Sequence, residues 1–199
     1  MDTVEFYFDC SSPWTYLGFE TMLKVMERHP NLDLVYKPIL VGGVFNAVNP
    51  SVYEGRENPI PPKQTYYAKD LQDWARYVGI NIGQPPVFPV NSVKAMRGAF
   101  VALEESCLVP YARLVFRRYW TELLDISREP VLRDIVREVG MDADSFFDKI
   151  GSPPYKDKLR ETTDELIRRG GFGSPTMFLN GDDMYFGNDR ITLLESRLG

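Results

Sequence analysis

The chain has 199 residues, of which 44% are hydrophobic and 13% aromatic, enough to bury the core of one domain or of one domain with a large insertion. Its 23 Lys and Arg residues against 28 Asp and Glu give a formal net charge of -5, with no long run of one sign, which excludes an extended nucleic-acid or membrane surface and favours a small-molecule partner. Cys10 and Cys107 form neither a CxxC pair nor a metal-ligand cluster, and the chain carries no apolar stretch near the roughly 20 residues of a membrane helix. The first residues show no signal-peptide pattern, so we expect a cytoplasmic protein without a metal site.

The amino-terminal third is predicted to fold as strand, helix and strand. Val4–Asp9 is rich in β-formers and runs directly into Ser and Pro, which is typical of a strand followed by a helix start. Apolar residues then recur at helical spacing over 12–26 until His29-Pro30. A second strand, Leu32–Lys37, follows. Because a helix-length connection joins the two strands, we expect them to be parallel neighbours in one sheet.

The middle of the chain is predicted to be mostly helical. Residues Asn49–Pro62 are rich in Pro, Asn and Gly and are expected to form a long loop. Apolar stripes at helical spacing then predict helices over Lys63–Gly79, Ser92–Glu105, Tyr111–Leu124, Pro130–Val139, Asp142–Ile150 and Pro154–Arg169.

The carboxyl-terminal segment returns to strands. Thr176–Leu179 and Asp183–Phe186 read as short strands, and Asn180-Gly181 between them is a strong hairpin signal. Asp189 then opens a last helix that is expected to reach Leu198. The pattern predicts an α/β fold: a thioredoxin-like domain built from residues 1–45 and 170–199, with a large all-helical insertion domain at 46–169.

Four segments in chain order resemble one family. Phe6–Gly18, which reads FYFDCSSPWTYLG, resembles the amino-terminal signature of the 2-hydroxychromene-2-carboxylate isomerases and the kappa-class glutathione transferases, which share a DsbA-like thioredoxin fold. The stretches 89–97, Gly173–Phe178 and Gly187–Arg190 match the same family in the same order. Together the four segments cover nearly the whole chain, so the resemblance extends to the complete fold.

Ser12 is the expected catalytic residue. A helix amino-terminus carries unpaired N–H groups and a partial positive charge, so it stabilises a thiolate placed there. Disulfide oxidoreductases of this fold use their own cysteine, but here that position is Ser12, and Thr15 stands where the resolving cysteine belongs. The resemblance therefore implies glutathione as cosubstrate, with the Ser12 hydroxyl donating to its thiolate. Judged alone, Ser12-Pro13 is more typical of an ordinary N-cap followed by proline at the first helical position. Both roles can hold at once, and Ser11 is the alternative hydroxyl.

The resemblance also implies a glutathione site at the other end of the chain. Pro175 corresponds to the cis-proline of thioredoxin-like folds, and the main chain of Ser174 would pair with the cysteinyl part of glutathione like an added strand. Relatives more often carry an aliphatic residue before this proline, and local sequence alone favours an ordinary trans proline. Gly187, Asn188 and Asp189 are expected to bind the γ-glutamyl group, although helix capping alone also explains Asp189.

The acceptor substrate is expected to bind in the insertion. Lys63 follows the Pro-rich loop and resembles a family lysine, which makes it a candidate partner for a carboxylate, with Asn49 and Asn91 as weaker candidates for the same pocket. An exposed lysine is more commonly just solvated.

The resemblance implies a glutathione-dependent isomerase of 2-hydroxychromene-2-carboxylate, or of a related aromatic-degradation intermediate, that works by reversible thiolate addition. Its partner would be a small aromatic or unsaturated carboxylate, and the protein is expected to be a homodimer that binds neither nucleic acid nor membrane. Two alternatives stay open. One is a kappa-like glutathione transferase that leaves the conjugate intact, and the other is a non-catalytic thiol-peptide binding module.

Overall fold

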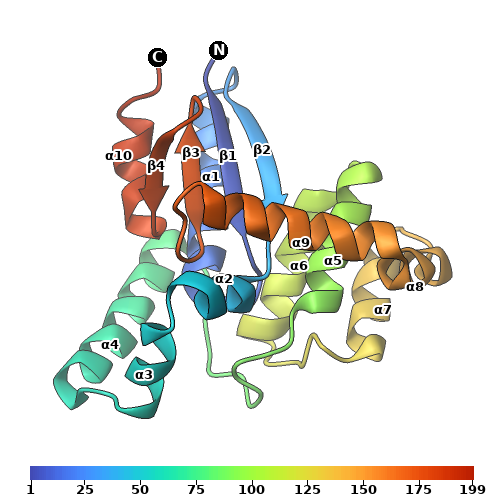
Figure 1. Cartoon of the computed structure of the whole chain (residues 1–199), viewed down its shortest axis with the longest axis horizontal. Helices are drawn as coiled ribbons and strands as arrows, with labels where there is room; N and C mark the ends of the chain where they lie inside the picture. The colour runs from blue at the N-terminus through green and yellow to red at the C-terminus, as the bar shows by residue number, and fades with distance from the viewer.

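A computed structural model describes all 199 residues (Figure 1). Four strands form one mixed sheet, and the remaining chain is almost entirely helical. The strands are β1 (Thr3–Phe8), β2 (Asp33–Pro38), β3 (Thr176–Leu179) and β4 (Asp183–Phe186). The helices are α1 (Pro13–Arg28), α2 (Val41–Val48), α3 (Ser51–Glu57), α4 (Pro61–Val78), α5 (Val93–Glu104), α6 (Leu108–Phe116), α7 (Glu129–Glu138), α8 (Ala143–Gly151), α9 (Pro153–Arg168) and α10 (Ile191–Glu195), together with the π-helical turn η1 (Arg117–Thr121) and the 3-10 turn η2 (Asn188–Arg190).

The sheet has the strand order β2-β1-β3-β4. As expected, β1 and β2 are parallel, with Phe6 opposite Tyr36, and the β3–β4 pair is an antiparallel hairpin. Asn180 and Gly181 both take positive φ values, 49° and 107°, which is the backbone conformation that such a tight turn requires. Helices α1 and α10 lie on one side of the sheet, and α9 and α2 lie on the other (Figure 1).

Side-chain alternation along β1 builds both faces of the core. Phe6 and Phe8 are fully buried in the large hydrophobic cluster that contains α1, whereas Tyr7 packs with Leu166 of α9 and Phe178 of β3 on the opposite face. The large cluster is continuous with the lobe of helices α5 to α8, because Phe116 of α6 packs against α1. The α/β fold expected from the sequence is confirmed, with one core shared by the sheet and the helical lobe.

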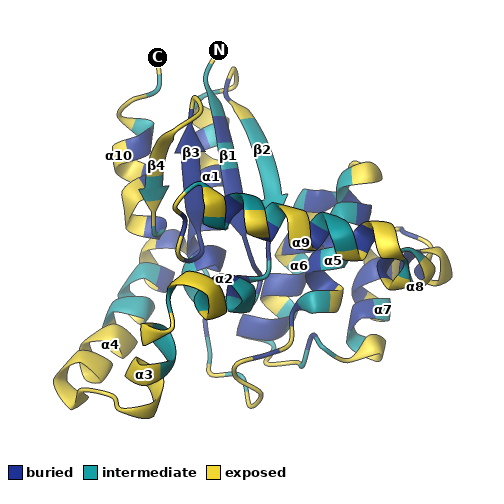
Figure 2. Cartoon of the chain, in the orientation of Figure 1, coloured by how far each residue is buried: buried dark blue, intermediate teal, exposed yellow.

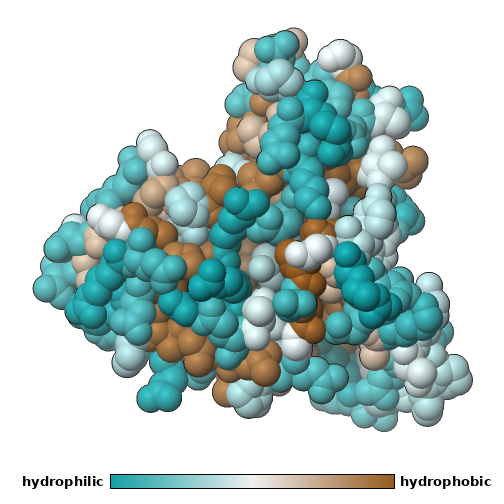
Figure 3. Space-filling model, turned by 180° about the vertical axis from the view of Figure 1, so that it is seen from behind, coloured by the Kyte–Doolittle hydropathy of each residue, from teal (hydrophilic) through white to brown (hydrophobic).

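Helices α3 and α4, residues 51–78, form an arm that is largely exposed (Figure 2). Only the last turns of α4 dock on the body, where Lys24 Nζ of α1 donates to the Val78 carbonyl at 2.6 Å. From behind, apolar surface gathers over the lobe of α5 to α8, while the arm is mostly hydrophilic (Figure 3). No helix combines the length and hydropathy needed to cross a bilayer.

Three local predictions were wrong. The expected loop at 49–62 contains α3, which sequence periodicity missed because none of its residues is buried. The helix expected over 111–124 starts earlier, passes into η1 and stops before Leu123, whose φ of 61° ends it. The helix expected over 189–198 is instead η2 followed by the five-residue α10.

The division into two domains stays a prediction. Its first boundary, between residues 45 and 46, falls inside α2. Helix α9 belongs to the predicted insertion but packs against the sheet.

Candidate active site

Ser12 caps the amino-terminus of α1. Its Oγ accepts a hydrogen bond from the Thr15 N–H at 3.2 Å, and Pro13 takes the first helical position, where a missing N–H costs nothing. The first-turn N–H of Trp14 has no acceptor, because the residue four positions back lies outside the helix. This end of α1 therefore presents a half-exposed hydroxyl and a free N–H group beside the positive end of the helix dipole.

The loop before β3 meets this helix end. The Ser174–Pro175 peptide bond is cis, and the Ser174 carbonyl accepts a hydrogen bond from Ser12 Oγ at 3.4 Å. The main-chain N–H of Ser174 has no acceptor in the chain. Gly18 lies directly under the proline ring, since a Cβ at residue 18 would stand 2.9 Å from Pro175 Cγ. The Ser174 N–H is thus left without a partner inside the chain, and the pairing of this residue with an extended peptide stays a prediction.

The side chain of Ser174 fixes this loop to α1. The hydroxyls of Ser174 and Thr15 share a hydrogen bond of 2.8 Å, and Ser174 Oγ also accepts from the main-chain N–H of Asp9 at 3.2 Å. Both hydroxyls are buried. An aliphatic residue at 174 would make neither contact, so the serine at this position serves to hold the loop on Thr15 and on the Asp9 main chain.

Asp9 is a buried acidic residue beside the Ser12 loop that the sequence analysis did not single out. Its carboxylate is completely buried, and it accepts hydrogen bonds from the N–H of Ser11 at 2.9 Å, the N–H of Val41 at 2.9 Å and the Ser92 hydroxyl at 3.0 Å. Burial raises the pKa of Asp9, while these donors favour the charged form and act against that shift. Asp9 thus ties the loop before α1 to the starts of α2 and α5. Its position directly after a buried strand was the available sequence signal.

No reactive thiol accompanies Ser12. Cys10 is 1% exposed, and burial raises the pKa of its thiol well above the usual range, so the sulfur stays protonated. Its carbonyl accepts a hydrogen bond from Trp120 Nε1 at 2.9 Å, which anchors the segment leading to Ser12. Cys10 therefore offers no thiolate at this helix end.

The segment 187–190 lies against the cis-proline. The Gly187 N–H donates to the Pro175 carbonyl at 3.0 Å, and Gly187 takes a φ of 98° that disfavours other residues. The Asn188 side chain is buried, and its Nδ2 has no hydrogen-bond partner. Asp189 is exposed and forms an ion pair with Arg190. The structure therefore brings Ser12, Ser174, Pro175 and Gly187 together and places the polar groups of 188 and 189 beside them.

The three predicted substrate-binding residues lie on different elements and make different contacts. Asn49 caps α2, and its Nδ2 donates to the Phe172 carbonyl at 3.1 Å, just before the cis-proline loop. Asn91 is exposed and accepts from the Val93 N–H at the start of α5, next to Ser92. Lys63 lies in the first turn of α4, and its exposed side chain makes no hydrogen bond or ion pair. Their roles stay predictions.

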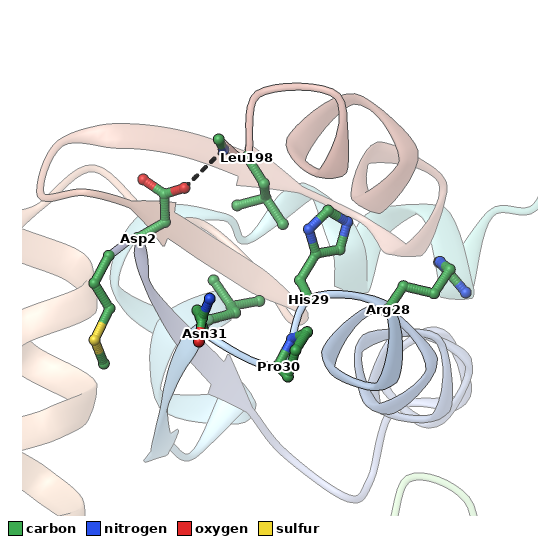
Figure 4. A pocket seen from close by; sticks show the side chains of 9 residues that line it. Asp2, Arg28, His29, Pro30, Asn31 and Leu198 are labelled. Carbon is green, nitrogen blue, oxygen red and sulfur yellow. Dashed lines mark hydrogen bonds between the residues drawn. The ribbon is translucent and has the colours of Figure 1, made fainter.

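A hollow of about 550 Å³ lies at the end of the sheet where β1 and β2 begin, opposite to the Ser12 end. Asp2, Arg28 and His29 are among the residues that line it (Figure 4). The Arg28 guanidinium donates to both carboxylate oxygens of Glu195, at 2.8 and 2.9 Å. The hollow is formed where β1 begins and α1 ends, whereas Ser12 follows the end of β1, so the two sites are separate.

Comparisons with known proteins agree on one group of relatives. A family model described as a DSBA-like thioredoxin domain matches residues 3–199. The chain is 33% identical over 204 residues to the 2-hydroxychromene-2-carboxylate isomerase of Pseudomonas putida, which covers 98% of this chain and 94% of that relative. It is 31% identical over 212 residues to glutathione S-transferase kappa 1 of Homo sapiens, covering 99% and 90%.

A solved structure gives the same result in three dimensions. The structure of a 2-hydroxychromene-2-carboxylate isomerase superposes with a TM-score of 0.82 at 30% sequence identity, covering 98% of this chain and 93% of that chain. The relatives are isomerases and glutathione transferases, which supports an enzyme that acts on a small molecule.

Proposed function

Since the chain belongs to the DSBA-like thioredoxin family, and within it to the group of 2-hydroxychromene-2-carboxylate isomerases and kappa-class glutathione transferases, we propose that it is a glutathione-dependent isomerase. Its substrate would be 2-hydroxychromene-2-carboxylate or a related aromatic carboxylate. One observation carries the proposal: a serine hydroxyl caps α1 opposite a cis-proline loop in which the main-chain N–H of Ser174 has no acceptor within the chain.

The residues at this position fit glutathione. The unpartnered N–H and the carbonyl of Ser174 suit main-chain pairing with the cysteinyl part of the tripeptide. The Ser12 hydroxyl suits donation to a thiolate. The polar segment at Asn188 and Asp189 suits the γ-glutamyl end, where an unpartnered buried Nδ2 leaves a donor to satisfy. Glutathione supplies a sulfur nucleophile that adds reversibly to an electrophilic carbon.

The chain would contribute electrostatics and orientation. On binding, the Ser12 hydroxyl would turn its one proton from the Ser174 carbonyl to an anion at the helix mouth, and the dipole of α1 favours negative charge at the same place. Ser174 and Pro175 fix the direction of the bound peptide, while the Ser174 hydroxyl holds their loop on Thr15. Asp9 holds the Ser11 N–H and so fixes the approach to Ser12.

A glutathione titration tests the proposal. We expect the ultraviolet absorbance of a thiolate to rise and saturate as glutathione is added to the wild-type protein at neutral pH, and to be lost or shifted to higher pH in Ser12→Ala. Ser11→Ala is the matched control, since this neighbouring hydroxyl makes no contact with the cis-proline loop, and it should leave the titration unchanged. Saturable binding without any thiolate signal in the wild type would refute the role of Ser12, and the absence of binding would refute glutathione dependence.

The product distinguishes the isomerase from a kappa-like transferase. Chromatography of 2-hydroxychromene-2-carboxylate incubated with enzyme and glutathione should give an isomer of unchanged mass and no net loss of glutathione. A stable conjugate, with stoichiometric loss of glutathione, would assign the transferase reaction instead. From the same resemblance, the proposal includes a homodimer in the cytoplasm, which sedimentation and cell fractionation would test.

A further inference from the structure

Arg56 is an unpaired guanidinium held by three aromatic rings. Its Cζ lies 5.2 Å from the ring centre of Phe88 and 5.9 Å from those of Phe45 and Tyr53. These distances are within the range of cation–π attraction. Arg56 makes no ion pair and no hydrogen bond, although Glu54 and Glu57 lie on the same short helix. Its N–H groups are therefore free to donate while the rings limit its movement.

The rings come from separate parts of the chain. Phe45 belongs to α2, Tyr53 to α3, and Phe88 to the connection between α4 and α5. Arg56 thus joins the exposed arm to the connection between α4 and α5 through its contact with Phe88. The Tyr53 hydroxyl donates to Asn46 Oδ1 at 2.8 Å. This hydrogen bond fixes α3, the helix that carries Arg56, against α2.

Two routes connect this cation to the proposed active site. Through α2, the Val41 N–H donates to Asp9, and Asn49 at the other end donates to Phe172 before the cis-proline loop. Phe45 lies between these two tethers. Helix α2 is therefore held between the loop that leads to Ser12 and the loop that carries Pro175.

The second route runs through the ring of Phe88. That ring lies 6.1 Å from the ring of Trp120, whose Nε1 donates to the carbonyl of Cys10, two residues before Ser12. Phe88 is 50% exposed although it is fully apolar. An exposed phenyl ring next to an unpaired guanidinium is suited to a ligand that is itself aromatic and anionic.

A second exposed aromatic pair borders the cis-proline loop. Phe172 and Phe186 are 37% and 39% exposed, with ring centres 4.5 Å apart. Phe186 also lies against Gly173, where a Cβ would come within 2.7 Å of its ring. The rings of Phe172 and Phe186 thus border the cis-proline loop, and the ring of Phe88 packs near the segment that leads to Ser12. Arg56 is the cation of the ring cluster formed with Phe45, Tyr53 and Phe88.

We propose that Arg56 is the specificity-determining residue for the acceptor: its guanidinium binds the carboxylate of an aromatic carboxylate substrate, whose ring lies along Phe88. This inference rests on the proposed function and assigns a residue that the sequence analysis missed, because α3 was expected to be loop. Planar, bidentate donation to a carboxylate is the geometry that arginine provides and lysine does not.

The test uses two acceptors that differ only in the group Arg56 would bind. Benzylidenepyruvate carries a carboxylate, and benzylideneacetone carries a methyl group in its place. Calorimetric titration without glutathione measures binding of each compound to the full chain. We expect Arg56→Met to weaken binding of benzylidenepyruvate on the order of tenfold to a hundredfold, and to leave benzylideneacetone within about twofold, since no charged contact is lost.

Three further variants complete the design. Arg56→Lys should bind benzylidenepyruvate with intermediate affinity, because it keeps the charge without the planar fork. Arg128→Met removes another exposed arginine without an ion pair and should change nothing. Lys63→Met tests the alternative cation on α4. An equal loss for both acceptors in Arg56→Met, no loss for either, a selective loss only in Lys63→Met, or a wild type that binds neither acceptor would each overturn the assignment.

The glutathione titration separates the two proposals. Arg56→Met should bind glutathione and form its thiolate like the wild type, while KM for 2-hydroxychromene-2-carboxylate, the substrate of the proposed reaction, rises more than kcat falls. If the wild type binds no glutathione yet discriminates the two acceptors through Arg56, the proposed reaction fails and the anion site stands.

Discussion

The hydroxyl pair of Thr15 and Ser174 offers a quantitative test of how the cis-proline loop is held on α1. Ser174→Ala removes an acceptor from the buried N–H of Asp9 and a partner from the buried Thr15 hydroxyl. A hydrogen bond contributes about 1 kcal/mol net, and an orphaned buried group costs about 1–3 kcal/mol. We expect this variant to lose about 2–3 kcal/mol of unfolding free energy.

Thr15→Val should cost less, because it removes one contact and leaves Ser174 accepting from Asp9. We expect a loss of about 1 kcal/mol. The double variant should be about as stable as Ser174→Ala alone, since the Thr15 hydroxyl that this substitution would orphan is then absent. The coupling free energy between the two sites is therefore expected to be about 1 kcal/mol.

Urea unfolding followed by circular dichroism measures all four proteins at neutral pH. Thr21→Val is the matched control, because the Thr21 hydroxyl donates only to the Leu17 carbonyl within α1 and lies far along the helix from the loop. Losses at 15 and 174 that add to within about 0.3–0.5 kcal/mol would refute the reasoning. Glutathione affinity should fall in Ser174→Ala, in which the loop loses both side-chain anchors.

Two further predictions concern packing and charge. Gly18→Ala would place a methyl group 2.9 Å from the rigid ring of Pro175, so we expect it to lose about 1–3 kcal/mol of unfolding free energy and to melt at a lower temperature. The control Gly42→Ala meets nothing within 4 Å and should be neutral or stabilising. Equal melting temperatures for the two variants would contradict the close approach. Hydrogen bonding from Lys158 lowers the pKa of Glu104, so its contribution to stability is present above the ordinary carboxyl range and is lost as the pH falls through the lowered pKa. We expect Glu104→Gln to lose about 1 kcal/mol or less of unfolding free energy at neutral pH, because solvent screens this half-exposed pair. In urea unfolding, the difference in free energy between the variant and the wild type should vanish in acid. A difference that persists in acid would exclude the ion pair as its cause.

Local features of the sequence determined most of the secondary structure. The strand before Ser12, the serine and proline at the helix start, and the Asn180-Gly181 hairpin each depend on residues a few positions apart, and all were confirmed. Parallel pairing of the first two strands followed from the length of the helix between them. These predictions succeeded because capping, turn conformation and periodicity act over one or two turns of chain.

Helix α3 shows where such reasoning fails. Its residues bury no side chain, so the chain carries no apolar periodicity there, and proline and asparagine at its ends read as loop. Arg56 was overlooked for the same reason. The exposure of α3 also explains why an arginine there can stay unpaired.

The sequence alone therefore determined the fold class and the position of Ser12 at a helix start, because both depend on interactions between residues that are close in the chain. Only the tertiary structure decided what surrounds that hydroxyl. The Ser174 hydroxyl meets Thr15 across 159 positions, and the Asp9 carboxylate meets Ser92 across 83. The rings of Phe45 and Phe88 close on Arg56 from two different elements. Contacts of this kind depend on how the sheet and helices pack, which fixes distances between groups that no local pattern connects.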